Sequence, residues 1–355
     1  MYKFRIYPSG KQKVRIIRQF KICKEIYNTL LDLNKKLLVT NKFQLNGLIT
    51  DIKLTCPEYY SQAHSQVLQN VSDRLHKAFD SFFRRIKEGA KEKGFPRFKS
   101  RVMSITYPQS GFKFLNNKHI QVSKIGSLPI ILHRIPKGKI KTMTIKVNKA
   151  NQWFAVFACE IPDSKVVNHS AEKIGIDVGL ESFATLSNGE KIINPKHLVK
   201  SEKRIRLLQR RLSRKKKGSA NRRKAKFRLS KAHLKVSNIR ADFLHKLSRK
   251  IVKSFSFIAV EDLQVTSMVK NHTLAKSISD ASWSCFMQML EYKAVTSGSG
   301  FVKVSPRNTS RNCSKCGHIQ DMPLAVREFV CADCGFACHR DLNSAYNILV
   351  RADCP

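Results

Sequence analysis

Acidic residues are scarce in this chain. Its 355 residues include 67 lysines and arginines but only 25 aspartates and glutamates, which gives a formal net charge of +42. Such an excess of one sign goes beyond what solubility requires and indicates a polyanionic partner. An anionic membrane surface fits less well, because the charge is spread along the chain instead of following one amphipathic face.

Long apolar runs are also missing. No stretch of 18 or more apolar residues occurs, so no membrane-spanning segment is expected. The first residues, Met1 to Tyr7, alternate like a short strand and lack the apolar segment of a signal peptide. We therefore expect a cytoplasmic protein with reduced thiols. Because 42% of the residues are hydrophobic, the chain can bury the cores of two or three domains.

The hydrophobic period changes along the first half of the chain. Apolar residues recur three or four positions apart from Val14 to Leu38 and from Val67 to Ile86, which predicts amphipathic helices. From Ser104 to Pro162 the pattern becomes that of strands. Residues 2–6 alternate in the same way, so we predict a β domain that is interrupted by a helical insert.

Four of the ten cysteines form two C-x-x-C pairs, and a glycine follows each pair: Cys313, Cys316, Cys331 and Cys334. Four thiolates at this spacing can close a tetrahedral shell around Zn²⁺, which makes the site structural because no position is left for water. The loop between the pairs is long enough for a ribbon hairpin. Two redox or disulfide pairs are the alternative, which the lack of a signal peptide disfavours. Cys338 is interpreted as a packing residue.

Three carboxylates stand at the ends of apolar elements. Asp177 lies in the strand Ile174 to Gly179, Glu261 follows the apolar run Phe255 to Val260, and Asp341 opens a helical pattern after the second cysteine pair. Acids at the carboxyl ends of buried strands often face a site. Asp177 as a turn cap and Asp341 as a helix N-cap remain the alternatives.

A single geometry accommodates all three acids. Two neighbouring strands and a helix packed across their face would bring Asp177, Glu261 and Asp341 to one centre, where Mg²⁺ or Mn²⁺ offsets their repulsion. Two such ions about 4 Å apart activate water and stabilise the leaving oxygen of a phosphodiester. The charge of the chain predicts the same substrate.

The densest charge lies between Lys200 and Lys250, where 21 lysines and arginines stand against Glu202 and Asp242. Helical spacing predicts two long helices joined near Gly218. A solvated charged face is the alternative, but clustered cations without counter-charges favour phosphate contacts. The candidates for contacts to a nucleic-acid backbone are Arg210, Arg211, Arg214, Lys215, Lys216 and Lys217.

A second candidate interface lies on the early helix. Gln66, Gln69 and Asn70 offer amides at helical spacing beside a basic face, and such amides can read base edges. Ordinary helix surface is the simpler interpretation of the same residues.

These residues resemble a known family, TnpB, also called OrfB, which bacterial and archaeal insertion sequences encode and which is related to compact type V CRISPR effectors. The resemblance covers nearly the whole chain. The segments that carry it are GFPRFKS at Gly94, IGIDVG at Ile174, NIRADFLHK at Asn238, VEDL at Val260, TSRNCSKCG at Thr309, and HRDLNSAYNI at His339.

The resemblance implies an α/β plus β architecture with a ribonuclease H-like (RuvC) nuclease domain. The expected parts are a β-barrel wedge domain at residues 1–12 and 100–168, a helical recognition domain at 13–99, the nuclease domain at 169–306 and 337–355, and an inserted zinc ribbon at 307–336. The recognition domain would serve the guide and the target, and the zinc ribbon would bind the target nucleic acid.

The resemblance also implies an RNA-guided DNA endonuclease that takes its guide RNA from its own transposable element and cuts double-stranded target DNA. Asp177, Glu261 and Asp341 would be the catalytic ligands of Mg²⁺ or Mn²⁺, and Arg327 would stand near the scissile phosphate. We expect one protein per RNA, although a dimer is an alternative, and a nucleoid-associated location in a bacterial or archaeal cytoplasm. An accessory protein of transposition without cutting activity and a structure-selective nuclease remain alternative functions.

Overall fold

The computed structural model describes residues 1–37, 41–161, 172–323 and 326–353. The chain divides into two compact units, Met1–Pro162 and Asp163–Pro355. No helix in these described ranges combines the length and the apolar character needed to cross a membrane.

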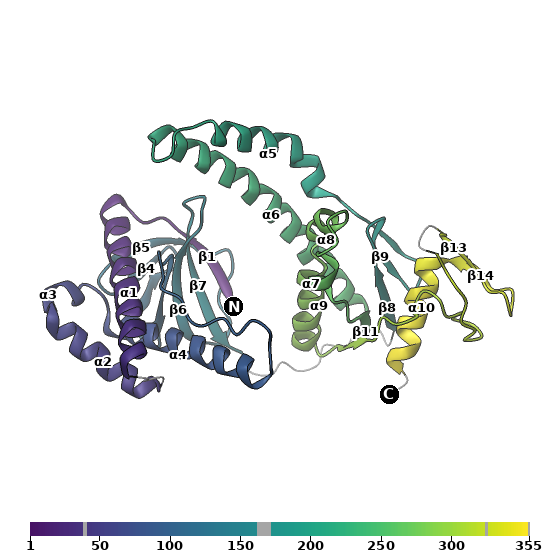
Figure 1. Ribbon diagram of the computed structural model, residues 1–355, viewed down its shortest axis with the longest axis horizontal. Helices are drawn as coiled ribbons and strands as arrows, with labels where there is room; N and C mark the ends of the chain where they lie inside the picture. The colour runs from purple at the N-terminus through teal and green to yellow at the C-terminus, as the bar shows by residue number, and fades with distance from the viewer. Residues whose placement is uncertain (38–40, 162–171, 324–325, 354–355) are drawn as a thin grey trace. The chain divides into compact units, whose positions relative to one another are not determined.

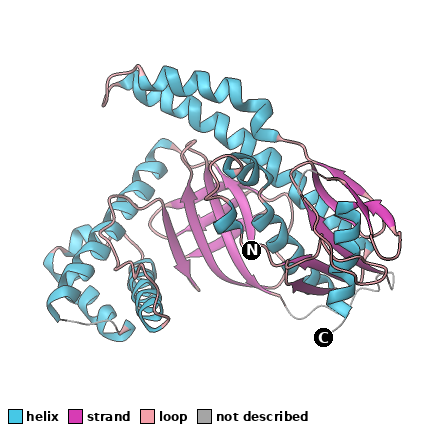
Figure 2. Cartoon of the chain, turned by 45° about the vertical axis from the view of Figure 1, so that its right-hand side comes forward, coloured by secondary structure: helices cyan, strands magenta, loops and turns pink. Residues whose placement is uncertain are grey.

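The first unit is built on a seven-stranded antiparallel sheet with the strand order β2-β6-β7-β1-β5-β4-β3 (Figures 1 and 2). The strands are β1 (Tyr2–Ile6), β2 (Ser104–Pro108), β3 (Phe112–Asn116), β4 (His119–Val122), β5 (Gly126–Ile131), β6 (Lys139–Val147) and β7 (Trp153–Glu160). The first strand of the chain thus lies in the middle of a sheet whose other strands come about a hundred residues later, as the sequence predicted.

This sheet must curl. Its two edge strands, β2 and β3, are consecutive in the chain and only residues 109–111 connect them. A connection of that length spans at most about 14 Å, whereas the edges of a flat seven-stranded sheet would stand about 29 Å apart. The sheet therefore bends into a half-barrel, and its concave side encloses part of the core.

Four helices fill the interval between β1 and β2: α1 (Gly10–Leu37), α2 (Lys42–Thr55), α3 (Pro57–Tyr60) and α4 (Ser65–Lys87). The predicted helices from Val14 and Val67 correspond to α1 and α4 and are confirmed within a few residues. Val67, Val71 and Leu75 line one face of α4 and join the core of the sheet. Trp153, Phe112 and Phe114 pack with the same core.

The second unit carries a five-stranded sheet with the order β10-β9-β8-β11-β12. Its strands are β8 (Lys173–Val178), β9 (Ser182–Leu186), β10 (Lys191–Ile193), β11 (Phe257–Glu261) and β12 (Gly300–Val304). β8, β11 and β12 are parallel, while β9 and β10 form an antiparallel meander. The apolar runs that the sequence analysis identified as strands are β8 and β11.

The helices of this unit are α5 (His197–Ser213), α6 (Ala220–Ser254), α7 (Val265–Met268), α8 (Ala275–Ala281), α9 (Trp283–Ser297) and α10 (Arg340–Asp353). α5 and α6 form a long antiparallel hairpin, as predicted from the charge-rich segment (Figures 1 and 2). Ile176 and Val260 face the core formed with residues of α6 and α9, whereas Ala259 packs with Ile348 of α10. The sheet is therefore covered by α10 on one face and by α6 and α9 on the other.

Gly175 sets how closely α10 approaches the sheet. A Cβ atom at this position would lie 2.1 Å from the carbonyl oxygen of Ala345 and 2.9 Å from the amide nitrogen of Leu349. Because both are backbone atoms, they cannot move aside without moving the helix. Only glycine permits this approach.

We expect Gly175→Ala to lower the free energy of unfolding of this unit by about 1–3 kcal/mol, the usual cost of overpacking. Urea denaturation measures this change in the free energy of unfolding. Gly47→Ala is the control, because Gly47 lies in α2 with no atom within 4 Å of its added Cβ, and it should leave stability unchanged or slightly higher. Equal stability of Gly175→Ala and wild type would contradict the close contact.

Candidate metal centre and nucleic-acid interface

Asp177 and Glu261 lie side by side on neighbouring parallel strands. The register pairs Ile176 of β8 with Val260 of β11, so the next residue on each strand is a carboxylate. Register partners about 4.8 Å apart point to the same face of a sheet. Since Ile176 and Val260 face the opposite core, both carboxylates point to the face that α10 covers.

Asp341 reaches this face from α10. It lies in the first turn of the helix, one turn before Ala345, whose carbonyl contacts Gly175 of β8. The backbone N–H of Asp341 donates to Nδ1 of His339 at 3.2 Å, so the residue that caps this N-terminus is His339. The N-cap alternative for Asp341 therefore does not apply. The expected arrangement of two neighbouring strands and one helix packed across them is confirmed.

The surroundings of Asp177 disfavour its charge. Burial, followed by the negative charges of Glu261 and Asp341, raises the pKa of Asp177 well above its ordinary value. The charge of Arg340 and the N–H of Val178 act in the opposite direction but do not compensate. Asp177 is thus close enough to Glu261 and to Asp341 for their charges to repel its own, which is the condition that a bound cation relieves.

Glu261 is buried, with 9% of its surface exposed, and burial raises its pKa. A hydrogen bond from the Thr309 hydroxyl and the charge of Arg351 limit that rise. Two of the acids accept from different donors: the Thr309 hydroxyl for Glu261 and the Val178 N–H for Asp177.

The four cysteines lie closer together than the acids. Their sulfur atoms all lie within 4.8 Å of one another, and this is the one group of three or more such ligands found in the described part of the chain. The Sγ atoms of Cys313 and Cys334 and those of Cys316 and Cys331 are 3.6 Å apart. Four converging thiols fit a tetrahedral Zn²⁺.

The two C-x-x-C turns share one backbone design. The N–H of Gly317 donates to the Cys313 carbonyl at 2.9 Å, and the N–H of Gly335 donates to the Cys331 carbonyl at 3.1 Å. Both glycines adopt positive φ angles, 79° and 68°, which side chains disfavour. The N–H groups of Cys334 and Asp333 help to lower the pKa of Cys331 to about 6, whereas the neighbouring thiols help to raise the pKa of Cys316 to about 12.

The ribbon differs in one respect from the sequence prediction. Antiparallel pairing flanks each cysteine turn instead of filling the loop between them: β13 (Glu328–Val330) pairs with β14 (Ala337–His339) around the second turn, and Asn312 pairs with Ile319 around the first. Each turn is itself the tip of a short hairpin. Cys338 packs against the buried Cys313, Phe329 and Cys331, in agreement with its interpretation as a packing residue.

Buried amides attach the first cysteine turn to α10. Nδ2 of Asn343 donates to the Asn312 carbonyl at 2.6 Å, and Oδ1 of Asn343 accepts from the N–H of Ser314 at 2.9 Å. Nδ2 of Asn347 donates to the carbonyls of Thr309 and Asn312 at 2.8 and 2.7 Å. Sequence reasoning missed these residues, although two asparagines one turn apart in a buried helix were a usable signal.

Arg327 lies beside the carboxylate site. Its carbonyl accepts from the N–H of Arg340 at 2.7 Å, which places it next to the start of α10. Its guanidinium is half exposed and forms an ion pair with Glu181, with Nε 3.1 Å from Oε2. Glu181 belongs to the turn between β8 and β9, just after Asp177. The guanidinium of Arg327 can contact a substrate phosphate once it has released the Glu181 carboxylate.

A groove runs between α5 and α6. It holds two adjoining hollows of about 730 and 490 Å³ that share Leu208, Arg211 and Arg228. None of the described side chains that line it is acidic. Its cations are Lys200, Arg204, Arg211, Lys215, Lys224, Arg228, Lys231 and Lys235.

The sequence analysis predicted the hairpin of α5 and α6. It did not predict which residues of the two helices line the groove. Among its six candidates only Arg211 and Lys215 line the groove, and Arg210, Arg214, Lys216 and Lys217 do not. The cations of α6 that line it were missed.

The amide candidates on α4 lie in different environments. Oε1 of Gln66 accepts from the N–H and the hydroxyl of Ser110, so this side chain holds the loop that joins β2 to β3. Oδ1 of Asn70 accepts from Nε of Arg74 at 2.9 Å. Gln69 is exposed. Gln69 is therefore the amide best placed to contact another molecule.

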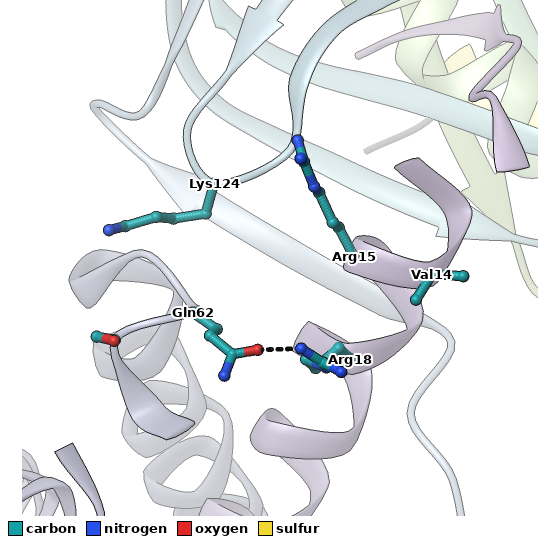
Figure 3. A pocket seen from close by; sticks show the side chains of 6 residues that line it. Val14, Arg15, Arg18, Gln62 and Lys124 are labelled. Carbon is teal, nitrogen blue, oxygen red and sulfur yellow. Dashed lines mark hydrogen bonds between the residues drawn. The ribbon is translucent and has the colours of Figure 1, made fainter. Parts of the chain in front are cut away.

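A basic hollow of about 340 Å³ lies close to the start of α4 (Figure 3). Arg18 donates to Oε1 of Gln62 at 2.7 Å, and Arg15 donates to the carbonyl of Ile125 at 3.0 Å. The residues that line it are Val14, Arg15, Arg18, Ser61, Gln62 and Lys124. Three of these residues, Arg15, Arg18 and Lys124, are cations.

Three family profiles match the chain. Residues 156–272 match OrfB of the IS605 type, described as "Probable transposase", residues 283–348 match the Cas12f1-like TNB domain, and residues 1–42 match a helix-turn-helix domain. In the last of these the structure shows β1 and α1, so the described part of that match contains a single helix.

Related proteins align over nearly the full length. A Streptomyces pristinaespiralis protein, provisionally named as an RNA-guided DNA endonuclease, is 36% identical over 98% of this chain and 88% of its own length. InsQ of Escherichia coli K12, provisionally named in the same way, is 31% identical over 98% of this chain and 91% of its own length.

The fold matches a solved structure too. Cas12f1, in a complex with single-guide RNA and target DNA, superposes with a TM-score of 0.60 at 17% identity and covers 95% of this chain and 82% of that one. At that identity the likeness concerns the fold. The two relatives at 36% and 31% identity, together with the OrfB profile, establish that the chain belongs to the TnpB (OrfB) family.

Proposed function

We propose that this protein is an RNA-guided DNA endonuclease that hydrolyses target DNA at one RuvC-like, metal-dependent site. The observation that carries the proposal is the convergence of Asp177, Glu261 and Asp341 on the face of the sheet under α10, in surroundings that raise the pKa of Asp177. The relatives provisionally named as RNA-guided DNA endonucleases support the same activity.

The topology of the second unit supports the assignment of a ribonuclease H-like fold. A three-stranded antiparallel meander, β8 to β10, is extended by parallel β11 and β12 on the side of β8. The two strand carboxylates stand on the neighbouring strands β8 and β11 of this sheet. In the proposed domain organisation, residues 169–306 and 337–355 form the nuclease domain and residues 307–336 the zinc ribbon.

The donor set fits the metals expected from the sequence. Asp177, Glu261 and Asp341 would hold Mg²⁺ or Mn²⁺, because hard carboxylate oxygens prefer these ions. When bound, such ions supply a nucleophilic hydroxide and stabilise the leaving oxygen. The four cysteines would hold a structural Zn²⁺, and Arg327 would supply a positive charge to the phosphate beside the three acids.

The groove between α5 and α6 is the proposed contact for the backbone of guide RNA paired with target DNA. Cations without acidic partners repel one another, and neutralising phosphates releases counterions from the nucleic acid. Such contacts add affinity without reading sequence. Gln66, Gln69 and Asn70 of α4 are proposed to stand near the target-adjacent motif, with Gln69 as the side chain that reaches a base edge.

Replacing Arg211 and Arg228 by glutamine should weaken binding of the guide-target duplex equally for all sequences. The slope of log affinity against log salt concentration should fall by about 1 for each phosphate that the variant no longer neutralises. Fluorescence anisotropy at several salt concentrations measures this slope. Lys226→Gln is the control, since Lys226 lies on the same helix but does not line the groove. An equal loss of affinity in the control variant would show that the groove is not the contact surface.

The test of the proposed function is guided cleavage. The protein, purified with RNA transcribed from the end of its own element, is mixed with Mg²⁺ and with duplex DNA that either matches or does not match the guide. We expect cleavage of the matched duplex alone, and sequencing should identify one discrete copurified RNA species.

The two alternative functions predict other outcomes. Cleavage of branched DNA without regard to the guide would identify a structure-selective nuclease. Tight binding of RNA and DNA without cleavage in Mg²⁺ or Mn²⁺ would identify an accessory protein of transposition. Either result contradicts the proposed function.

A further inference from the structure

The carboxylate site and the cysteine cluster are joined by one continuous set of buried and partly buried hydrogen bonds. Thr309 stands at one end of this set, with 3% of its surface exposed. Its hydroxyl donates to Oε1 of Glu261, which is also buried. The Pro306 carbonyl is a second acceptor for the same hydroxyl, at 3.2 Å.

The loop that holds Thr309 ends in the cysteine turn. The Thr309 carbonyl accepts from Asn347, Asn347 and Asn343 both donate to the carbonyl of Asn312, and Asn343 accepts from the N–H of Ser314. Asn312 and Ser314 are the neighbours of Cys313. Because Cys313 follows Thr309 so closely along the chain, the position of the cysteine fixes the position of the hydroxyl.

We propose that Thr309 is a positioning residue for Glu261, and that Asn343 and Asn347 transmit the fold of the cysteine cluster to the carboxylate site. This inference rests on the proposed function for the role of Glu261. It gives the zinc ribbon a task in the carboxylate site, where it orients one of the metal ligands.

The geometry explains why this support is needed. Glu261 is the last residue of β11 and has a longer side chain than Asp177, so a strand alone does not fix its carboxylate. The positive charge of Arg351 acts on it from α10 without a direct hydrogen bond among those found in the described residues. A single buried donor, whose own backbone carbonyl is held by the amide of Asn347, restricts the carboxylate to one orientation. α10 also carries Asp341, so the same helix places one ligand directly and another through the loop.

The test compares Thr309→Val, which removes the hydroxyl at nearly constant volume, with Thr309→Ser, which keeps it. In the RNA-bound protein, Thr309→Val should weaken Mn²⁺ binding about 10- to 100-fold, the usual effect of losing a hydrogen bond to a metal ligand. The same variant should need a correspondingly higher Mg²⁺ concentration for half-maximal cleavage. Thr309→Ser should restore both values to within about 3-fold of wild type.

Two further variants separate positioning from folding. Thr296→Val is the control, because its hydroxyl donates to the Tyr292 carbonyl on α9, away from the acids. Asn347→Leu removes the amide that holds Thr309, and we expect it to weaken Mn²⁺ binding without loss of zinc. Combined with Thr309→Val it should add little, since both changes break the same set of bonds. Zinc content and melting temperature of each variant confirm that the ribbon is folded.

The inference would be overturned if Thr309→Val bound Mn²⁺ as tightly as the wild type. It would also be overturned if Thr309→Ser bound Mn²⁺ as weakly as Thr309→Val. Mn²⁺ affinity does not depend on cutting. A wild-type protein that binds Mn²⁺ but cleaves no guided DNA would therefore contradict the proposed function alone, while the comparison of the three Thr309 forms would still decide this inference.

Discussion

Asp177→Asn should abolish DNA cleavage and at the same time stabilise the folded protein in the absence of divalent ions. Removing a group that supports charge in the transition state lowers the cleavage rate by at least about 100- to 1,000-fold. Guide RNA binding should be unchanged, because Asp177 lies under α10 and does not line the basic groove. Single-turnover cleavage and RNA titration measure the two effects.

The stabilisation follows from the sign of the pKa shift. Burial and two neighbouring acids raise the pKa of Asp177 in the folded state, so ionising it costs stability as pH rises above the ordinary aspartate range. Asparagine removes that cost. We expect the melting temperature at neutral pH to rise by about 2–4 °C, the change that 1 kcal/mol produces in a domain of this size.

Divalent ions provide the matched control for this variant. Mg²⁺ should raise the melting temperature of the wild type and have a much smaller effect on Asp177→Asn, because binding to the folded state alone stabilises it. A variant that cuts like the wild type, or that melts well below it without Mg²⁺, would remove Asp177 from the proposed site.

Cys331→Ser should release the zinc and unfold the ribbon. Loss of one thiolate from a four-cysteine site removes most of a binding free energy that is about 10–16 kcal/mol in isolated zinc fingers. We expect one zinc per chain in the wild type and almost none in the variant, by elemental analysis of the purified protein. The rate of backbone amide hydrogen exchange should rise throughout residues 309–339. Cleavage should fall at least about 10-fold, because the loop that orients Glu261 loses its anchor.

Cys285→Ser is the control for this change, since Cys285 is an exposed free cysteine outside the cluster. The zinc content, the amide exchange rates and the cleavage rate of this variant should equal those of the wild type. Retention of zinc by Cys331→Ser, or unchanged amide exchange in the ribbon, would contradict the four-cysteine site.

The parts of the site that the sequence predicted are those encoded locally. A carboxylate in an apolar strand, as at Asp177, or at the end of one, as at Glu261, is visible without a structure, and the strand register then brings the two acids together. The C-x-x-C spacing is likewise a local signal, since the glycine after each pair allows the positive φ of the turn. Their convergence with Asp341 required only the packing of one helix on two strands.

Other features depend on contacts between distant segments and could not be predicted. The curvature of the first sheet follows from its strand order, in which β2 and β3 take opposite edges, and it was expected only through the family resemblance. Which cations line the groove depends on how α5 and α6 rotate against each other, so Arg228 is in the groove and Arg210 is not. Gln66 shows the same limit, because its amide is engaged by Ser110, 44 residues away.

Anomalous diffraction from Mn²⁺ bound to the wild-type protein, with guide RNA and a non-cleavable target DNA, tests the central claim most directly. The account predicts Mn²⁺ peaks in contact with the carboxylates of Asp177, Glu261 and Asp341 and next to a DNA phosphate. Peaks elsewhere, with these three carboxylates free of metal in the presence of a bound target, would contradict it.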